Sequence, residues 1–224
     1  MATITPPQPP APPWTPGTVA ELLDHLGVPA SRVRLHPPIG TATERDATES
    51  KHLHGTLCEL VDGTLVEKAM GYFESRLSHV LSFFMETHLT NHPIGFILGE
   101  AGPVKTVAGR VRMPDVGFYR WDQFPGKSLP PGGVIPVPVL LAVEILSPSN
   151  TAAEMESKRR EYFASGTRLY WEVHPTTRQV RIYHNAEEFT PLGENDILAG
   201  DPVIPGFKLP IRVWFDRAGN RPVA

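Results

Sequence analysis

One stretch of the chain constrains the fold most: residues 139–149 read VLLAVEILSPS, a nearly continuous apolar run with one carboxylate, Glu144, in its middle. Such a run is typical of a strand that is buried on both faces, at the centre of a sheet. An ionised carboxylate that is left unpaired in apolar surroundings costs several kcal/mol. We therefore expect a positively charged group to stand opposite Glu144.

The segments before this strand predict both helices and strands. Asp62-Gly63 separates two alternating runs within residues 57–68, which is a strong hairpin signal. Apolar residues at helical spacing over 72–89 predict a long helix with one face against a sheet. A short helix is expected at 18–27 and a loop at 36–54, with further strands at 94–99, 103–108 and 111–120.

The segments after the strand complete the expected sheet. A helix is predicted at 151–166, with Ser147 or Ser149 as its N-cap, and two strands follow at 169–175 and 179–184. The order strand, helix, strand indicates a crossover between parallel neighbours. We therefore predict an α/β fold with a mixed central β-sheet flanked by helices.

Composition limits the domain organisation and the class of protein. The chain has 224 residues, of which 41% are hydrophobic, and fits one domain over 18–224. Seven prolines within residues 6–16 make 1–17 a proline-rich segment that we expect to be mobile. The single cysteine, Cys58, excludes an intramolecular disulfide framework and a site of several cysteines. Since neither a secretion signal nor a membrane span is recognised, a cytoplasmic protein is expected.

The charge balance limits how the protein could bind nucleic acid. A net charge of −3 gives no overall basic field. Binding of DNA would then depend on local patches, such as Lys158-Arg159-Arg160 or Arg110 with Arg112.

Three residues suggest a reaction when they are taken together: Asp115, Glu144 and Lys158. Two carboxylates supply the hard oxygen ligands that Mg²⁺ prefers, and a bound Mg²⁺ activates water and neutralises charge on a phosphate. An ammonium nearby could orient that water or help to deprotonate it. These residue types match a metal-dependent phosphodiesterase.

Several motifs resemble the Uma-two family, which is described as putative restriction endonucleases and forms a branch of the PD-(D/E)XK nuclease superfamily. The similarity spans about residues 55–215, and the helix 151–166 contributes Glu154, Lys158, Tyr162 and Gly166. The other matching segments are CELVDGTLV (58–66), PDV (114–116), VEILSPS (143–149), LYWEVHP (169–175) and PGFKLPI (205–211).

The resemblance implies a restriction-endonuclease-like core with an N-terminal hairpin and a long helix, and it implies site residues. Asp115 and Glu144 correspond to the metal ligands, with Mg²⁺ as the cofactor and Mn²⁺ as a substitute. The superfamily's usual lysine position holds Leu146, so its role is carried to Lys158 on the following helix. Glu59 and Glu74 have supporting roles.

Two positions depart from the family pattern. Glu74 stands where the family more often has a histidine, and Cys58 stands where an aromatic residue usually precedes the acid. Neither departure changes the pair of metal ligands.

Each candidate also has a structural explanation that the sequence leaves open. Glu144 could belong to a structural ion pair, and Lys158 could pair with Glu154 on a solvated helix face. The remaining candidates could be a turn-forming Asp115, an exposed hairpin residue Glu59 and a helix first-turn acid Glu74.

The sequence thus predicts a Mg²⁺-dependent endodeoxyribonuclease that hydrolyses DNA phosphodiester bonds. By analogy with other nucleases of this fold, a homodimer is expected. Two alternatives stay open: a catalytically silent binding or assembly module with a nuclease fold, and a Mg²⁺ phosphohydrolase acting on small nucleotides. No HExxH pair, glycine-rich phosphate loop or G-x-S-x-G elbow is present to suggest another chemistry.

Overall fold

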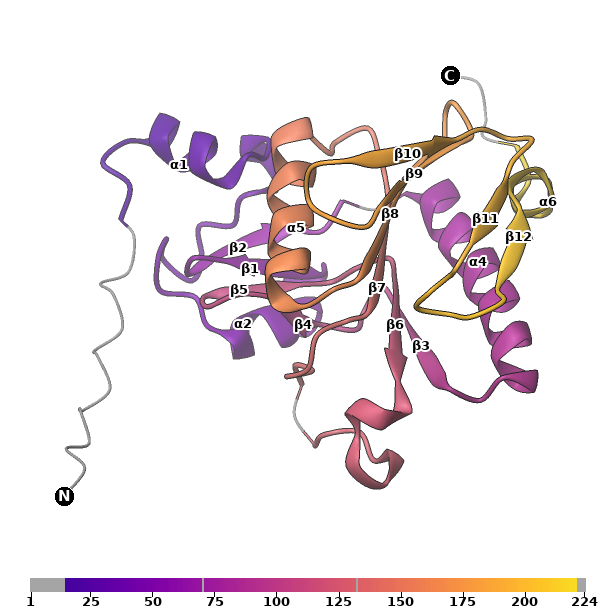
Figure 1. Cartoon of the computed structure of the whole chain (residues 1–224). Coiled ribbons are helices and arrows are strands. Elements are labelled where there is room, and N and C mark those ends of the chain that lie inside the picture. The colour runs from indigo at the N-terminus through magenta and orange to yellow at the C-terminus, as the bar shows by residue number, and fades with distance from the viewer. Residues whose placement is uncertain (1–14, 70, 132, 221–224) are drawn as a thin grey trace.

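The computed structural model describes residues 15–69, 71–131 and 133–220, whose arrangement is shown in Figure 1. Residues 1–14 of the proline-rich segment, which we expected to be mobile, lie outside the described residues. In the described part of the chain, no helix is both long and apolar enough to cross a membrane.

A six-stranded sheet forms the centre of the fold, with the strand order β10-β9-β8-β7-β6-β3. β7 runs parallel to β8, and the other neighbours are antiparallel, so the predicted mixed sheet is confirmed. All five residues of β7 are buried, as the apolar run predicted. The strands are β3 (Gly95–Gly99), β6 (Val116–Arg120), β7 (Leu141–Ile145), β8 (Leu169–His174), β9 (Gln179–Tyr183) and β10 (Phe189–Leu192).

The two faces of this sheet carry different helices, α4 (Tyr72–Asn91) on one and α5 (Ala152–Ser165) on the other (Figure 1). Successive side chains of a strand point to opposite faces. Leu141 and Val143 of β7 share a hydrophobic cluster with α4, whereas Ala142 shares one with α5. Glu144 therefore points to the α5 face.

Helix α5 connects β7 to β8, and its start differs from the prediction. Thr151 is the N-cap, and its hydroxyl accepts a hydrogen bond from the Glu154 N–H at 3.1 Å. Ser147 instead bonds with Asn150, whose side-chain oxygen accepts from the Ser147 N–H at 2.9 Å. The predicted caps Ser147 and Ser149 are wrong because residues 147–150 form the turn that ends the strand.

The predicted hairpin at residues 57–68 is confirmed as β1 (Cys58–Val61) and β2 (Thr64–Glu67). Asp62 and Gly63 have φ values of 47° and 75°, the left-handed pair that a type I′ turn needs. The hairpin belongs to a four-stranded sheet in the order β2-β1-β5-β4, with β4 at Val104–Lys105 and β5 at Arg110–Arg112.

The single strand predicted at 111–120 is wrong. The chain leaves the small sheet after β5 and enters the central sheet at β6. Pro114 lies between the two strands, and it has no N–H with which to continue a ladder. Asp115 consequently lies at the junction of the two sheets.

The loop predicted at 36–54 also needs correction, because it contains α2 (Glu44–Thr48) and α3 (Ser50–His54). A capping box starts α2: the Thr43 hydroxyl accepts from the Asp46 N–H, and the Asp46 carboxylate accepts from the Thr43 N–H at 2.7 Å. A helix of five residues is too short for an apolar period to reveal it.

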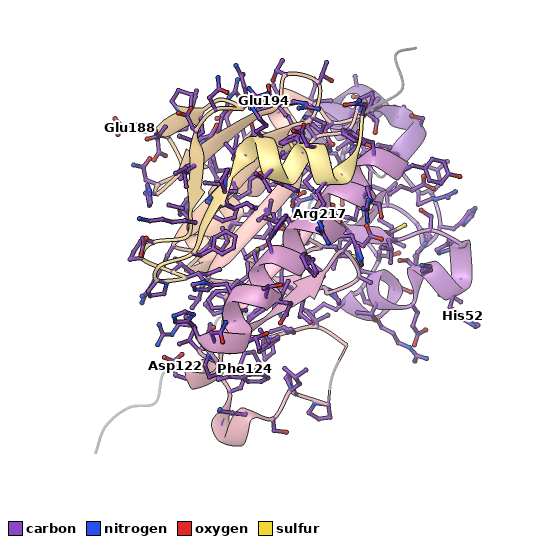
Figure 2. The ribbon with its side chains drawn as sticks, turned by 90° about the vertical axis from the view of Figure 1, so that its right-hand side faces the viewer. His52, Asp122, Phe124, Glu188, Glu194 and Arg217 are labelled. Carbon is purple, nitrogen blue, oxygen red and sulfur yellow. The ribbon has the colours of Figure 1, made fainter. Side chains whose placement is uncertain are left out.

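The remaining C-terminal elements pack beside α4 on its side of the central sheet, within the same hydrophobic cluster. Figure 2 looks onto this side, where Arg217 of α6 lies beside α4, with its guanidinium 4.5 Å from the centre of the Phe83 ring. The Trp214 indole N–H donates to the Leu77 carbonyl at 2.9 Å. These elements are α6 (Ile211–Ala218), β11 (Ile197–Ala199) and β12 (Lys208–Pro210), while α1 (Val19–Leu26), at the other end of the molecule, confirms the first predicted helix.

Candidate active site

Glu144 has the positive partner that its burial required, and helix α5 supplies it. The Lys158 ammonium donates to one oxygen of Glu144 at 3.3 Å, and the Tyr162 hydroxyl donates to the other at 3.0 Å. Lys158 and Tyr162 are four residues apart, so both lie on the face of α5 that meets the sheet. Glu144 is 4% exposed and Lys158 is 2% exposed.

Lys158 also joins the central sheet to the hairpin. Its ammonium donates to Glu59 at 2.9 Å and lies 3.9 Å from a Glu154 oxygen. The alternative of a solvated Lys158–Glu154 pair is therefore wrong. Glu59 is fully buried, not an exposed hairpin residue, and it also accepts hydrogen bonds from Arg112 at 3.0 Å and the Met113 N–H at 3.1 Å.

Asp115 lies beside Glu144 at the start of β6. Val116 pairs with Val143 in the antiparallel register, which brings the residue before Val116 next to Glu144. One Asp115 oxygen accepts from the Ile145 N–H at 2.6 Å, and the other lies 2.8 Å from the Lys68 ammonium. Asp115 is thus a buried, paired carboxylate.

The pKa values of Glu59, Glu144 and Lys158 are shifted by burial and by these ion pairs. Burial raises the pKa of Glu144 to about 7, against the opposing effect of Lys158 and Lys68, while the Asp115 charge adds to the rise. Burial would also raise the pKa of Glu59, but Lys158 and Arg112 bring it well below its usual value. For Lys158, burial opposes the charge, yet Glu144 and Glu59 raise its pKa, so the lysine stays an ammonium.

The donor set fits a hard divalent cation. Asp115 and Glu144 offer carboxylate oxygens on adjacent strands, and a cation between them would offset the repulsion that adds to the pKa rise of Glu144. Within the described ranges, no group of three or more His, Cys, Asp or Glu side chains is placed to hold a metal ion. Mg²⁺ commonly takes one or two carboxylates and completes its shell with water and substrate phosphate, so a pair suffices.

Glu74, the fifth candidate, lies in the first turn of α4. Its side chain is buried and folds back over Gly71, the N-cap residue of that helix. An acid at this position is favoured by the helix dipole. The contacts that join Glu59, Asp115, Glu144 and Lys158 do not include it, and a supporting role for Glu74 stays a prediction.

Several basic residues around the site were not predicted from the sequence. Lys68 ends the hairpin, and Arg32 binds both oxygens of Glu154 at 2.7 and 2.8 Å. Arg110 and Arg112, which we considered as a DNA-binding patch, are instead paired with carboxylates. No local pattern in the sequence indicates which acids these cations meet, because the acids lie on distant segments of the chain.

Arg112 and Glu161 form an ion pair with two hydrogen bonds, from which we expect the stability of the fold to depend on pH. Both bonds are 2.7 Å long. Burial opposes the charge on Glu161, but Arg112 and Arg110 lower its pKa from 4.5 to about 2. Because the folded pKa lies below the unfolded one, this acid stabilises the fold above about pH 4.5 by roughly 3 kcal/mol, and the contribution is lost as the pH falls towards 2.

Urea unfolding at pH 7 and pH 3 measures this contribution. The wild type is expected to lose more stability on acidification than Glu161→Gln, which lacks the titrating group. Glu156→Gln, an exposed acid on the same helix, should behave like the wild type. Equal losses in the wild type and Glu161→Gln would contradict the prediction.

Comparisons with known proteins agree with the fold. The family model Uma2, described as "Putative restriction endonuclease", matches residues 49–212. A crystal structure described as a putative nuclease belonging to DUF820, from Anabaena variabilis, superposes with a TM-score of 0.63 at 19% identity. The superposition covers 73% of this chain and 92% of that chain, and it shows a shared fold. Comparison with curated proteins gives no match.

Proposed function

Since the chain belongs to the Uma2 family of putative restriction endonucleases, we propose that it is a Mg²⁺-dependent endodeoxyribonuclease that hydrolyses phosphodiester bonds of DNA. The observation that carries this proposal is the pair Asp115 and Glu144 on adjacent strands, with Lys158 bound to Glu144 at 3.3 Å. Mn²⁺ should substitute for Mg²⁺, because it accepts the same oxygen ligands.

Asp115 and Glu144 would hold the cation. When bound, it supplies a Lewis acid that lowers the pKa of water and neutralises charge on the scissile phosphate. The chain's contribution is to hold both carboxylates in place. The Ile145 N–H orients Asp115, while Lys158 and Tyr162 orient Glu144.

In this proposal Lys158 acts as an ammonium and not as a general base. Its raised pKa, caused chiefly by Glu144 and Glu59 against the effect of burial, opposes loss of the proton. Glu59 is the positioning residue for Lys158, since it accepts one of its hydrogen bonds at 2.9 Å and is itself held by Arg112 at 3.0 Å.

The proposed substrate and setting follow from the same chemistry. A phosphodiester is an anion, and a divalent cation held by Asp115 and Glu144 can bind it. Cutting both strands of a duplex needs two such sites, and we propose that a homodimer supplies them. The one cysteine, Cys58, is a buried free thiol, which suits the cytoplasmic location that we propose.

One observation favours the alternative of a catalytically silent module. Both candidate ligands already have ammonium partners, Lys68 for Asp115 and Lys158 for Glu144, so the cluster is charge-compensated without a metal ion. In such a module the buried charges would serve to fix the packing of the hairpin against the central sheet.

A cleavage assay separates the possibilities. Purified protein is incubated with supercoiled plasmid, single-stranded DNA and mononucleotides, each with Mg²⁺, Mn²⁺ or EDTA, and Glu144→Gln serves as the control for a contaminating nuclease. We expect nicked and linear plasmid with Mg²⁺ or Mn²⁺ and none with EDTA. Cleavage of mononucleotides alone would favour the small-nucleotide phosphohydrolase, and no cleavage of any substrate would favour the silent module.

A further inference from the structure

Lys68 is a buried lysine at the candidate site that the proposed reaction does not use. It follows β2, and its own N–H donates to the Leu57 carbonyl at 2.8 Å, which fixes the backbone at the end of the hairpin. Its side chain reaches the junction of the two sheets, where the residue is 6% exposed. There the ammonium donates to the Met113 carbonyl and pairs with Asp115 at 2.8 Å.

The Lys68 ammonium occupies the side of Asp115 on which a metal ion would bind. One oxygen of Asp115 is held by the Ile145 N–H, and the other is the oxygen that Lys68 contacts. The charge of Lys68 also lowers the pKa of Glu144, so the ammonium lies within electrostatic reach of both candidate ligands. A divalent cation that approaches Asp115 from this side would meet a positive charge already in place.

Lys158 and Lys68 differ in the carboxylate partners that each would keep if a divalent cation bound to Asp115 and Glu144. Lys158 has Glu59 at 2.9 Å and Glu154 at 3.9 Å besides Glu144, so it keeps carboxylate partners when Glu144 binds a metal ion. The ion pair of Lys68 is with Asp115, and its other close partner is a neutral carbonyl. Of the two lysines, Lys68 is therefore the one that a cation would displace.

We propose that the Lys68 ammonium competes with a divalent cation for Asp115, and thereby sets the affinity of the site for that cation. The inference rests on the proposed function only in taking Asp115 and Glu144 as the ligands. Like charges in a poorly solvated site repel strongly, and a divalent ion is repelled by an ammonium twice as strongly as a monovalent one. Metal binding then requires the Lys68 side chain to leave Asp115.

The test measures the affinity for Mn²⁺ by calorimetric titration of the full chain at one pH and ionic strength. Lys68→Met keeps the length of the side chain and removes its charge, and we expect it to bind Mn²⁺ at least ~10-fold more tightly than the wild type. Lys68→Gln can still donate to the Met113 carbonyl, and it provides the same comparison should Lys68→Met fail to fold. Lys68→Arg keeps the charge and should not gain affinity.

Two controls test whether any gain in Mn²⁺ affinity arises at the proposed site. Lys105→Met makes the same change at a half-exposed lysine paired with the exposed Glu44, and it should leave the affinity unchanged. Adding Asp115→Asn to Lys68→Met should remove the gain, because the competed ligand is then gone.

The outcomes distinguish this inference from the proposed function. If the wild type binds Mn²⁺ and both neutral variants bind it no more tightly, Lys68 does not compete and the inference is overturned, while the metal site stands. If neither the wild type nor any Lys68 variant binds Mn²⁺, the metal site itself is wrong and both proposals fall. Tighter binding in Lys68→Met or Lys68→Gln that depends on Asp115 supports the inference.

Discussion

Glu144→Gln and Asp115→Asn are each expected to abolish divalent-ion binding and to lower the rate of DNA cleavage by at least ~10². Each change removes one anionic ligand and leaves a side chain of almost the same volume. The fold should persist. In Glu144→Gln the amide oxygen can still accept from Lys158, and the amide NH2 can donate to the Tyr162 hydroxyl oxygen. Lys68 keeps the Met113 carbonyl when Asp115 is changed.

Calorimetric titration with Mn²⁺ and the plasmid assay measure the two effects, and circular dichroism checks the fold. Asp122→Asn and Glu188→Gln are matched controls, since both acids lie on the surface, where Figure 2 labels them. The controls should bind Mn²⁺ and cut DNA like the wild type. Unchanged Mn²⁺ affinity in both Glu144→Gln and Asp115→Asn would refute the proposed metal site.

Local patterns were sufficient to predict the central strand of the sheet and the hairpin. The apolar run around Glu144 predicted a doubly buried strand, and β7 is buried along its whole length. Asp62-Gly63 predicted the hairpin because its left-handed turn is encoded by two adjacent residues. These features depend on neighbours in sequence, which is why a sequence alone reveals them.

The candidate site could be predicted only in part. The burial of Glu144 predicted a cationic partner. Lys158 was chosen from its residue type and from the family resemblance, because no periodicity links a strand residue to a helix residue 14 positions later. The partners of Lys68 and Arg112 were missed for the same reason. Lys68 meets the Met113 carbonyl 45 positions away, and Arg112 meets Glu161 49 positions away.

The break between β5 and β6 illustrates a further limit. A proline within a strand is typical of a sheet edge or a bulge, yet at Pro114 the chain changes sheets. Whether a strand bends within one sheet or passes to another depends on which partners lie beside it, and these partners come from distant segments. This change of sheet is what brings Asp115 to Glu144.

Loss of the Lys158 charge is expected to have the second large effect, which is on stability as well as on cleavage. Lys158→Met leaves Glu59 and Glu144 buried without their shared ammonium, and breaking a buried ion pair typically costs about 3 to 5 kcal/mol. An exposed i, i+4 ion pair on a helix would be worth only about 0.3 to 0.5 kcal/mol. Urea unfolding at pH 7 measures the difference.

Arg160→Met on the same helix is the matched control for this stability effect. Arg160 pairs with Glu156 at 2.7 Å, with side chains that are 63% and 51% exposed, so its loss should cost at most a few tenths of a kcal/mol. A cost as small for Lys158→Met would show that the buried network contributes little. The cleavage rate should fall by ~10² or more at a temperature where the variant is still folded.

A double variant separates the role of the ammonium in stability from its role in the reaction. Glu59→Gln combined with Lys158→Met removes one of the two acids that lose their partner, so part of the lost stability should return, with a non-additive energy of about 1 to 3 kcal/mol. Cleavage should stay low, because Glu144 still lacks the ammonium that lowers its pKa and orients it. If cleavage instead recovers together with stability, Lys158 acts on the reaction only by holding the hairpin against the sheet.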